Sequence, residues 1–167
     1  MPAANDNIGI APAAGLAHVR GDTDAPLSQQ TIPALLASTV ARFGSRPAVL
    51  FREQGIAWTW REFATVVDEM AAGLLALGLQ RGDRAGIWSP NRAEWLVTQF
   101  ATARIGVILV NINPAYRLAE LEYALNVSGC RAIVSAEQLK TSMYLQMLCS
   151  LAPELAHSEP GALKAAK

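Results

Sequence analysis

The stretch from Leu79 to Leu121 constrains the fold more than any other part of the chain. Residues 84–88 and 107–112 are short apolar runs of strand length, and residues 92–105 between them form a largely apolar segment of helix length that Gly106 ends. A strand, a crossover helix and a second strand make a βαβ unit, whose crossover is right-handed in nearly all known cases. The pattern therefore predicts two parallel strands of one sheet.

The segments on both sides of this unit extend the same pattern. Helical periodicity and helix-capping residues predict four further helices, over residues 31–43, 61–77, 117–128 and 136–149. Thr31 is the expected cap of the first, and Thr59 with Glu62 has the spacing of a capping box at the start of the second. Alternating and apolar runs predict a β-hairpin over residues 47–60 and another strand over residues 131–135. Strands separated by helices of this length are typical of a covered parallel sheet. We therefore expect an α/β fold, a parallel sheet with helices on both faces plus an N-terminal β-hairpin.

Composition divides the chain into two parts. Residues 1–30 are rich in Ala, Pro, Gly, Asn and Asp and show no periodicity, which predicts a flexible N-terminal arm. Residues 31–167 carry the predicted elements and have the length of one ordinary domain. Cys130 and Cys149 form no metal-binding motif, so we interpret them as reduced thiols.

Charge and hydropathy exclude several classes of partner. Lys plus Arg number 14 and Asp plus Glu number 14, so a formal net charge of zero gives no electrostatic footprint for nucleic acid. No apolar run reaches the roughly 18 residues that a membrane-spanning helix needs. The N-terminus has no apolar signal segment and carries Asp6, Asp22 and Asp24 against Arg20. These features predict a cytoplasmic protein.

No catalytic signature is visible in the residues themselves. A glycine-rich phosphate loop, a nucleophile elbow and a His/Cys zinc cluster are all absent. Ser89-Pro90-Asn91 follows a strand and opens a helix, where anions often bind, but without those glycines helix capping is the better interpretation. Trp58 and Trp60 could stack on a ligand, although the usual burial of aromatic side chains favours packing against a helix.

An ordered series of short motifs nevertheless resembles the N-terminal region of AMP-forming acyl-CoA synthetases, within the adenylate-forming superfamily. The series consists of residues 71–79, Arg81-Gly82-Asp83-Arg84, Pro90-Asn91 with Glu94-Trp95, Ile105-Gly106-Val107 and Val110-Asn111-Ile112-Asn113-Pro114. Residues 113–117, with the matching positions 120–121, 123–125, 128–130 and 160–164, are most similar to the medium-chain and fatty-acyl-CoA ligase branch. The resemblance covers residues 31–167, and it is carried by the order of the motifs.

This resemblance implies a two-step reaction for the parent enzyme. A carboxylate attacks the α-phosphate of ATP, giving acyl-AMP and pyrophosphate, and the thiol of coenzyme A then displaces AMP. ATP, Mg²⁺ and CoA are the implied cofactors, and a fatty or other carboxylic acid is the substrate. The motifs that hold them in the family are absent here, so we assign no catalytic, cofactor-binding or metal-binding residue. We expect a truncated N-terminal portion that is inactive alone, binds no cofactor tightly, and has the C-terminal remainder of the same enzyme as its partner.

Two alternatives stay open. The parent enzyme could be an adenylating ligase for another carboxylic acid, because nothing in these residues selects the acid. The chain could also be a non-catalytic α/β binding or interaction module left by truncation of a ligase gene. A continuing reading frame with the Ser/Thr/Gly-rich loop of the family would discriminate between these hypotheses.

Overall fold

The computed structural model describes residues 26–159 and 162–163. Most of the arm predicted over residues 1–30 lies outside the described residues, as does most of the motif at 160–164. The described residues from Thr31 onward form one compact unit. No helix among the described residues is long and apolar enough to cross a membrane.

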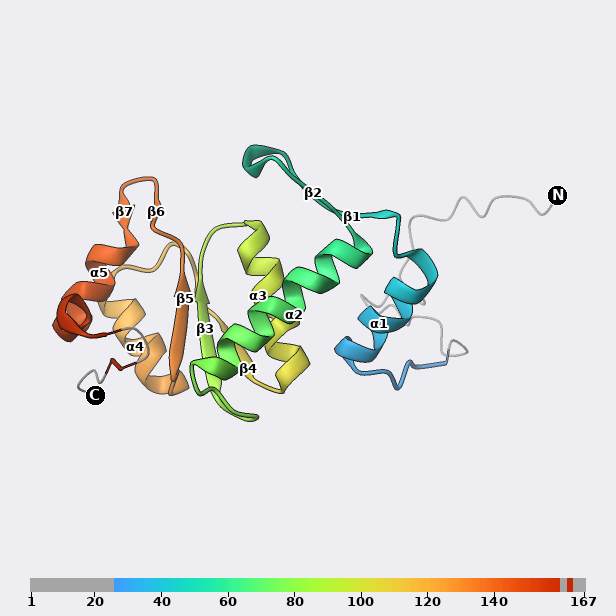
Figure 1. Cartoon of the computed structure of the whole chain (residues 1–167). Helices are drawn as coiled ribbons and strands as arrows, with labels where there is room; N and C mark the ends of the chain where they lie inside the picture. The colour runs from blue at the N-terminus through green and yellow to red at the C-terminus, as the bar shows by residue number, and fades with distance from the viewer. Residues whose placement is uncertain (1–25, 160–161, 164–167) are drawn as a thin grey trace, which may run out of the picture. The chain divides into compact units, whose positions relative to one another are not determined.

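The elements of this unit follow one another with short connections (Figure 1). The helices are α1 (Ile32–Phe43), α2 (Trp60–Ala76), α3 (Ala93–Ile105), α4 (Leu118–Ser128) and α5 (Tyr144–Leu151), with 3₁₀ turns η2 (Arg52–Gln54) and η3 (Pro153–His157). The strands are β1 (Pro47–Phe51), β2 (Ile56–Thr59), β3 (Arg84–Trp88), β4 (Ile108–Asn111), β5 (Ala132–Ser135), β6 (Gln138–Leu139) and β7 (Ser142–Met143).

Three parallel strands form the central sheet in the order β4-β3-β5. Ala85 of β3 pairs with Leu109 of β4 on one side and with Ala132 of β5 on the other. The chain therefore crosses from β3 to β4 in one direction and from β4 back over β3 to β5 in the other. Because such crossovers are right-handed, helices α3 and α4 must lie on opposite faces. Figure 1 shows this arrangement, with α2 and α3 on one side of the sheet and α4 and α5 on the other.

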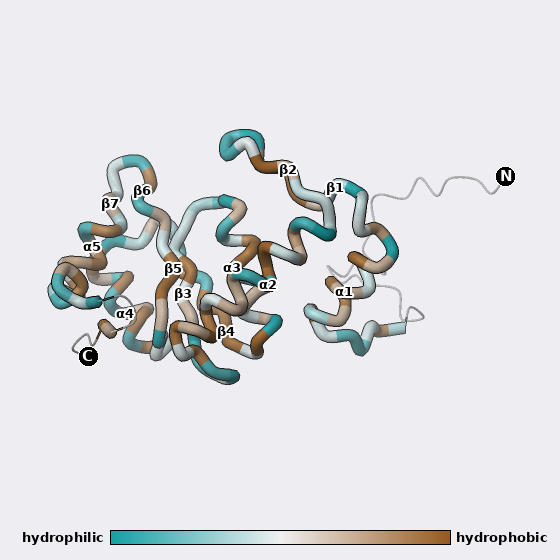
Figure 2. The backbone as a smooth tube through the Cα atoms, viewed as in Figure 1, coloured by the Kyte–Doolittle hydropathy of each residue, from teal (hydrophilic) through white to brown (hydrophobic). Residues whose placement is uncertain are grey.

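Each face of the sheet covers its own hydrophobic core, and β3 contributes to both. Ala85 packs with Val97 and Ala101 of α3 in one core, whereas Trp88 packs with Leu121 of α4 in the other. Apolar segments, brown in Figure 2, follow the sheet and its helices, whereas the tip of the β1–β2 hairpin is hydrophilic. The prediction of a parallel sheet covered on both faces and preceded by a hairpin is confirmed.

The first two helices begin where the sequence predicts. Thr31 caps α1, and its side chain accepts a hydrogen bond from the Ala34 amide at 3.3 Å. Thr59 and Glu62 form a capping box at the start of α2, where the Thr59 amide donates to a Glu62 carboxylate oxygen at 2.7 Å. These hydrogen bonds from Thr59 lower the pKa of Glu62. Both helix starts are fixed by residues within three positions of each other.

The predicted packing role of the hairpin tryptophans is also confirmed. The Trp58 ring stacks on the Phe63 ring with centroids 6.5 Å apart, and Trp60 meets the same ring edge-on at 6.4 Å. Trp60 starts α2 and does not continue the strand, so the two residues belong to different elements. Both side chains pack against the core between α2 and α3.

The helix predicted over residues 136–149 is wrong in its first half. The chain instead forms the short β6–β7 hairpin, with Lys140 in the left-handed region at φ 52°, and α5 begins only at Tyr144. Leu139, Met143 and Met147 have helical spacing, but spacing alone does not place Tyr144. Tyr144 is fully buried, and its ring stacks on Trp88 with centroids 3.7 Å apart. This contact with the central strand determines where the helix starts.

Candidate functional site

The neighbouring strands β3 and β5 define a topological switch point at their carboxyl ends. After β3 the chain leads to α3 on one face, and after β5 it leads to β6, β7 and α5 on the other (Figure 1). In open parallel sheets, ligands bind in the crevice outside the carboxyl ends of strands whose connections diverge in this way. We therefore take this edge of the sheet as the candidate site.

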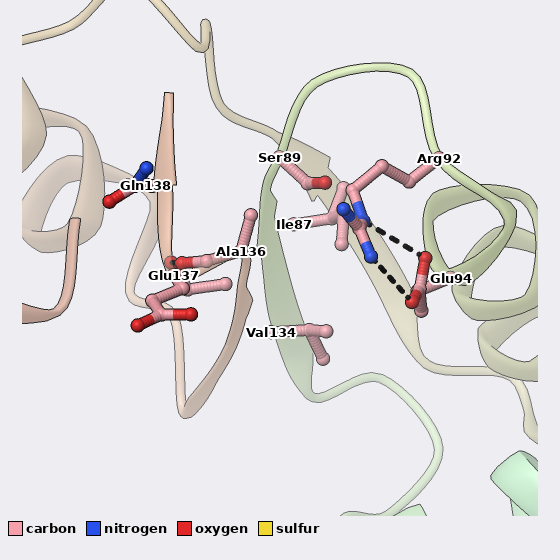
Figure 3. Close-up of a pocket in the computed structure, with 9 residues that line it drawn as sticks. Ile87, Ser89, Arg92, Glu94, Val134, Ala136, Glu137 and Gln138 are labelled. Atoms are coloured by element: carbon pink, nitrogen blue, oxygen red, sulfur yellow. Dashed lines mark hydrogen bonds and ion pairs between the residues drawn. The ribbon is translucent and has the colours of Figure 1, made fainter. Parts of the chain in front are cut away.

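A cleft of about 540 Å³ lies at this position. Two segments line it, the end of β3 with the start of α3, and the end of β5 with the start of β6 (Figure 3). The lining residues are Ile87, Ser89, Arg92, Glu94, Val134, Ser135, Ala136, Glu137 and Gln138. The cleft thus combines an apolar base from the strands with polar side chains from the loops that follow them.

The two serines of the cleft already donate hydrogen bonds. The buried Ser89 hydroxyl donates to the Pro90 carbonyl at 2.9 Å, and the Ser135 hydroxyl donates to the Ala136 carbonyl at 2.7 Å. No histidine or cysteine lines the cleft to remove a proton from either hydroxyl. These serines are therefore hydrogen-bonding groups of the wall and carry no nucleophile assignment.

An ion pair forms one side of the cleft. The Arg92 guanidinium donates from Nε and Nη2 to the two carboxylate oxygens of Glu94 at 3.2 and 3.1 Å (Figure 3). The hydrogen bonds from Arg92 lower the pKa of Glu94 to about 2, and the same contact raises the pKa of Arg92. Both side chains keep about half of their surface exposed. Glu94 therefore neutralises most of the positive charge that Arg92 presents to the cleft.

Residues near the start of α3 do not cap it as the sequence predicts. Ser89 bonds to the neighbouring Pro90 carbonyl, and Arg92 holds the N-cap position without a side-chain hydrogen bond to the helix. The Ala93 amide instead donates to Oε1 of Gln54 at 2.8 Å, from the tip of the β1–β2 hairpin. The capping interpretation of Ser89-Pro90-Asn91 is therefore wrong, because the cap comes from 39 residues away.

The loop after β4 is held by the aromatic pair beneath it. Trp88 Nε1 donates to the Asn113 carbonyl at 3.1 Å, and the Tyr144 hydroxyl donates to the Pro114 carbonyl at 2.5 Å. Asn113 also accepts the Ala115 amide on its side-chain oxygen at 2.9 Å. The motif at residues 113–117 thus lies at the same edge of the sheet as the cleft, and its backbone is fixed by two buried rings.

The charges of the cleft do not suit a polyphosphate or a metal ion. Arg92 is its one cation, and the carboxylates Glu94 and Glu137 outnumber it. Within residues 26–159 and 162–163, no three His, Cys, Asp or Glu side chains come close enough to hold a metal. The lining of this cleft therefore fits neither ATP nor Mg²⁺, and no step of catalysis is assigned to it.

Sequence reasoning assigned no site residue and so missed this cleft. Its two walls lie about 45 residues apart in sequence and carry no shared motif. One signal could have located them, because both segments directly follow predicted parallel strands. That rule identifies the edge of the sheet, although it does not identify which side chains face one another.

Comparisons with known proteins agree with the fold and the motifs. A medium-chain acyl-CoA ligase ACSF2, mitochondrial, from Danio rerio is 43% identical over 162 residues, covering 97% of this chain and 27% of the relative. The Homo sapiens protein of the same name is 40% identical over 159 residues, covering 95% and 26%. The N-terminal domain of FACL13 from Mycobacterium tuberculosis superimposes with a TM-score of 0.68 over 74% of this chain and 30% of that one, at 20% identity.

These relatives contradict the cytoplasmic location predicted from the sequence. The proteins from Danio rerio and Homo sapiens are both named as mitochondrial. The prediction depended on the lack of an apolar signal segment and on the charges of residues 6–24, which lie outside the described residues. A few acidic side chains in that stretch do not determine a compartment, and the prediction of a cytoplasmic location is therefore wrong.

The comparisons also define how much of a family member is present. The chain spans about a quarter of the length of the curated relatives it matches. The profile of the AMP-binding enzyme family matches residues 36–165, which include every strand of the parallel sheet and the whole candidate cleft. The chain belongs to the AMP-binding enzyme family.

Proposed function

We propose that residues 31–167 are the N-terminal part of the AMP-binding domain of a fatty-acyl-CoA ligase, and that residues 1–30 precede it as an arm. The observation that carries this proposal is the 43% identity to a medium-chain acyl-CoA ligase, spread over 97% of the chain. Identity at that level over the full length, together with the shared fold, favours the acyl-CoA ligase branch within the family.

The proposed activity is that of the assembled enzyme. It forms an acyl-adenylate from a carboxylic acid and ATP and then transfers the acyl group to CoA, with Mg²⁺ as the expected metal. The residues of this chain contribute the parallel sheet, the two hydrophobic cores and the two segments that line the cleft. Because the cleft holds one cation against two carboxylates, the phosphate-binding groups must come from elsewhere in the enzyme.

A chimeric enzyme tests this proposal. A putative acyl-CoA synthetase, YngI, from Bacillus subtilis is 37% identical to 140 residues of this chain, which cover 26% of that relative. Replacing its matched segment with the corresponding residues of this chain should give an enzyme that forms acyl-CoA from a medium-chain acid. The product is measured by chromatography of the thioester.

A matched variant controls for accidental activity of the chimera. A Cβ on Gly86 would lie 3.0 Å from Cδ1 of Ile112 in the centre of the sheet, so Gly86→Val should disrupt the fold and abolish activity. A folded chimera that forms neither acyl-adenylate nor acyl-CoA from any acid would contradict the proposal and favour a non-catalytic module. Turnover of aromatic acids alone would favour a ligase for another carboxylic acid.

A further inference from the structure

The tip of the β1–β2 hairpin is tied to the start of α3 by one side chain. Gln54 accepts the Ala93 amide on Oε1 at 2.8 Å and donates from Nε2 to Glu94 Oε2 at 2.9 Å. If the side-chain amide of Gln54 were flipped, its NH₂ group would face the Ala93 N–H and its oxygen would face the Glu94 carboxylate. The hydrogen-bond pattern therefore assigns Oε1 to the Ala93 side and Nε2 to the Glu94 side. A glutamine suits this position because it accepts and donates through the same planar group.

The Ala93 amide needs this partner. It is in the first turn of α3, where no carbonyl of the helix can accept its hydrogen bond. Ala93 is only 1% exposed, so water does not replace Gln54 as the acceptor. A buried amide without an acceptor is strongly unfavourable, and the start of α3 therefore depends on the hairpin tip.

The same side chain also restrains the ion pair of the cleft. Glu94 Oε2 receives Nε2 of Gln54 and Nε of Arg92, while Glu94 Oε1 receives Nη2 of Arg92. A continuous series of hydrogen bonds thus runs from the Ala93 amide through Gln54 and Glu94 to the guanidinium at the cleft. Figure 3 shows the last link of this series, with Arg92 and Glu94 facing each other on one side of the cleft.

We propose that Gln54 is a positioning residue of the cleft: the hairpin tip holds Glu94 and the start of α3, and through Glu94 it fixes the guanidinium of Arg92. Gln54 itself does not line the cleft and acts through its neighbours. This inference rests on the proposed function only in assuming that the cleft binds a ligand. The hydrogen bonds themselves do not depend on that function.

Exchanging the amide of residue 54 and the carboxylate of residue 94 tests this proposal on the full chain. Gln54→Glu keeps an acceptor for the Ala93 amide but places two carboxylates together. Glu94→Gln weakens the contact with Arg92. The double variant Q54E/E94Q restores one carboxylate and one amide, with the direction of the donor reversed. If the two side chains are in direct contact, Glu94→Gln should reverse the effect of Gln54→Glu. Without such a contact, the effects of the two substitutions should simply add.

Two ligand-free NMR measurements report the result. Repulsion from Glu94 should push the carboxylate that Q54E introduces away from the Ala93 amide. We therefore expect Q54E to lower the hydrogen-exchange protection of this amide by about tenfold, the scale of one weakened hydrogen bond, and the double variant to restore most of it. The Arg92 Nε–H resonance should shift in Q54E, because the added carboxylate displaces Glu94. Rescue in the double variant is judged on Ala93 alone, since Glu94→Gln itself weakens the contact with Arg92. A purely structural role of the hairpin would leave that resonance unchanged in any variant that stays folded.

A neighbouring substitution provides the control. Glu53→Gln changes the charge of the hairpin tip by one unit, as Gln54→Glu does in the opposite sense. Glu53 is exposed, and no side-chain hydrogen bond of Glu53 is found in the described part of the chain. This substitution should leave both measurements unchanged. The proposal is overturned if Q54E leaves Ala93 protection and the Arg92 resonance as they are, or if the double variant fails to restore the protection of Ala93. Neither measurement depends on ligase activity, so an inactive chimera would count against the proposed function alone.

Discussion

Helices α2 and α3 pack against each other, yet their first turns are built in different ways. The start of α2 is closed by Thr59 and Glu62, three residues apart, in a capping box. The start of α3 is closed by Gln54, which lies 39 residues before the amide that it accepts. The first arrangement is local and forms with the helix itself, whereas the second requires the hairpin to have folded and docked. Local and remote caps should therefore respond differently to mutation.

The largest expected effect is at the start of α5, which is also placed by a remote contact. Tyr144→Ala removes a fully buried ring that stacks on Trp88, and it should lower the free energy of unfolding by about 3–5 kcal/mol. Urea denaturation measures this change. Tyr144→Phe is the matched control, because it keeps the ring and loses only the hydrogen bond to Pro114, worth about 1 kcal/mol. Similar losses for both variants would show that the stacked ring is not the main contribution.

The remote cap should give the next largest effect. Gln54→Leu leaves the buried Ala93 amide without an acceptor, and we expect a loss of about 1–3 kcal/mol in the free energy of unfolding. The hydrogen exchange of amides in α3 should increase more than that of amides in α2. Equal increases in the two helices would indicate global destabilisation and would remove the contrast between them.

The local cap should contribute less. Thr59→Ala removes the side-chain acceptor for the Glu62 amide and should lower the free energy of unfolding by about 1 kcal/mol. Thr59→Ser keeps a hydroxyl and should remain close to the parent chain. Thermal and urea unfolding of the three proteins measure the difference. A loss larger than that of Gln54→Leu would reverse the ranking of the two caps.

The smallest expected effect is a dependence on pH. The pKa of Glu94 is lowered to about 2 in the folded chain, so its ion pair contributes stability above the unfolded pKa of about 4.3 and loses it as the pH falls toward 2. Solvent screens this half-exposed pair, which limits the change to about 0.5 kcal/mol. Glu94→Gln should flatten the acid limb of the unfolding curve between these pH values. An identical acid limb in the parent and Glu94→Gln chains would contradict the assignment.

The same contrast explains how much could be read from the sequence. The parallel sheet, the hairpin and the Thr31 and Thr59 caps depend on periodicity and on residues near one another, and all were predicted. The predicted helix start at residue 136 and the predicted cap at Ser89-Pro90-Asn91 are both wrong, because in each case a distant residue decides the local structure. Tyr144 stacks on Trp88, and Gln54 reaches Ala93, and neither contact leaves a pattern in the intervening residues.

The cleft was missed for the same physical reason. Its walls come from the ends of β3 and β5, which become neighbours only because the chain crosses back over β3. The order β4-β3-β5 is a property of the folded sheet, and the alternative in which β5 joins the outer edge of β4 has the same sequence periodicity. Resemblance to a family therefore supplied the function class, while the cleft itself required the structure.

Isothermal titration of ATP into the chain most directly tests the claim that these residues provide scaffold and not phosphate chemistry. The cleft holds Arg92 against two carboxylates, so we predict no binding at micromolar ATP, with or without Mg²⁺. The active chimera described above, titrated in the same way, should bind ATP. Micromolar binding to residues 1–167 alone would contradict the account, because it would require a nucleotide site that these charges do not provide.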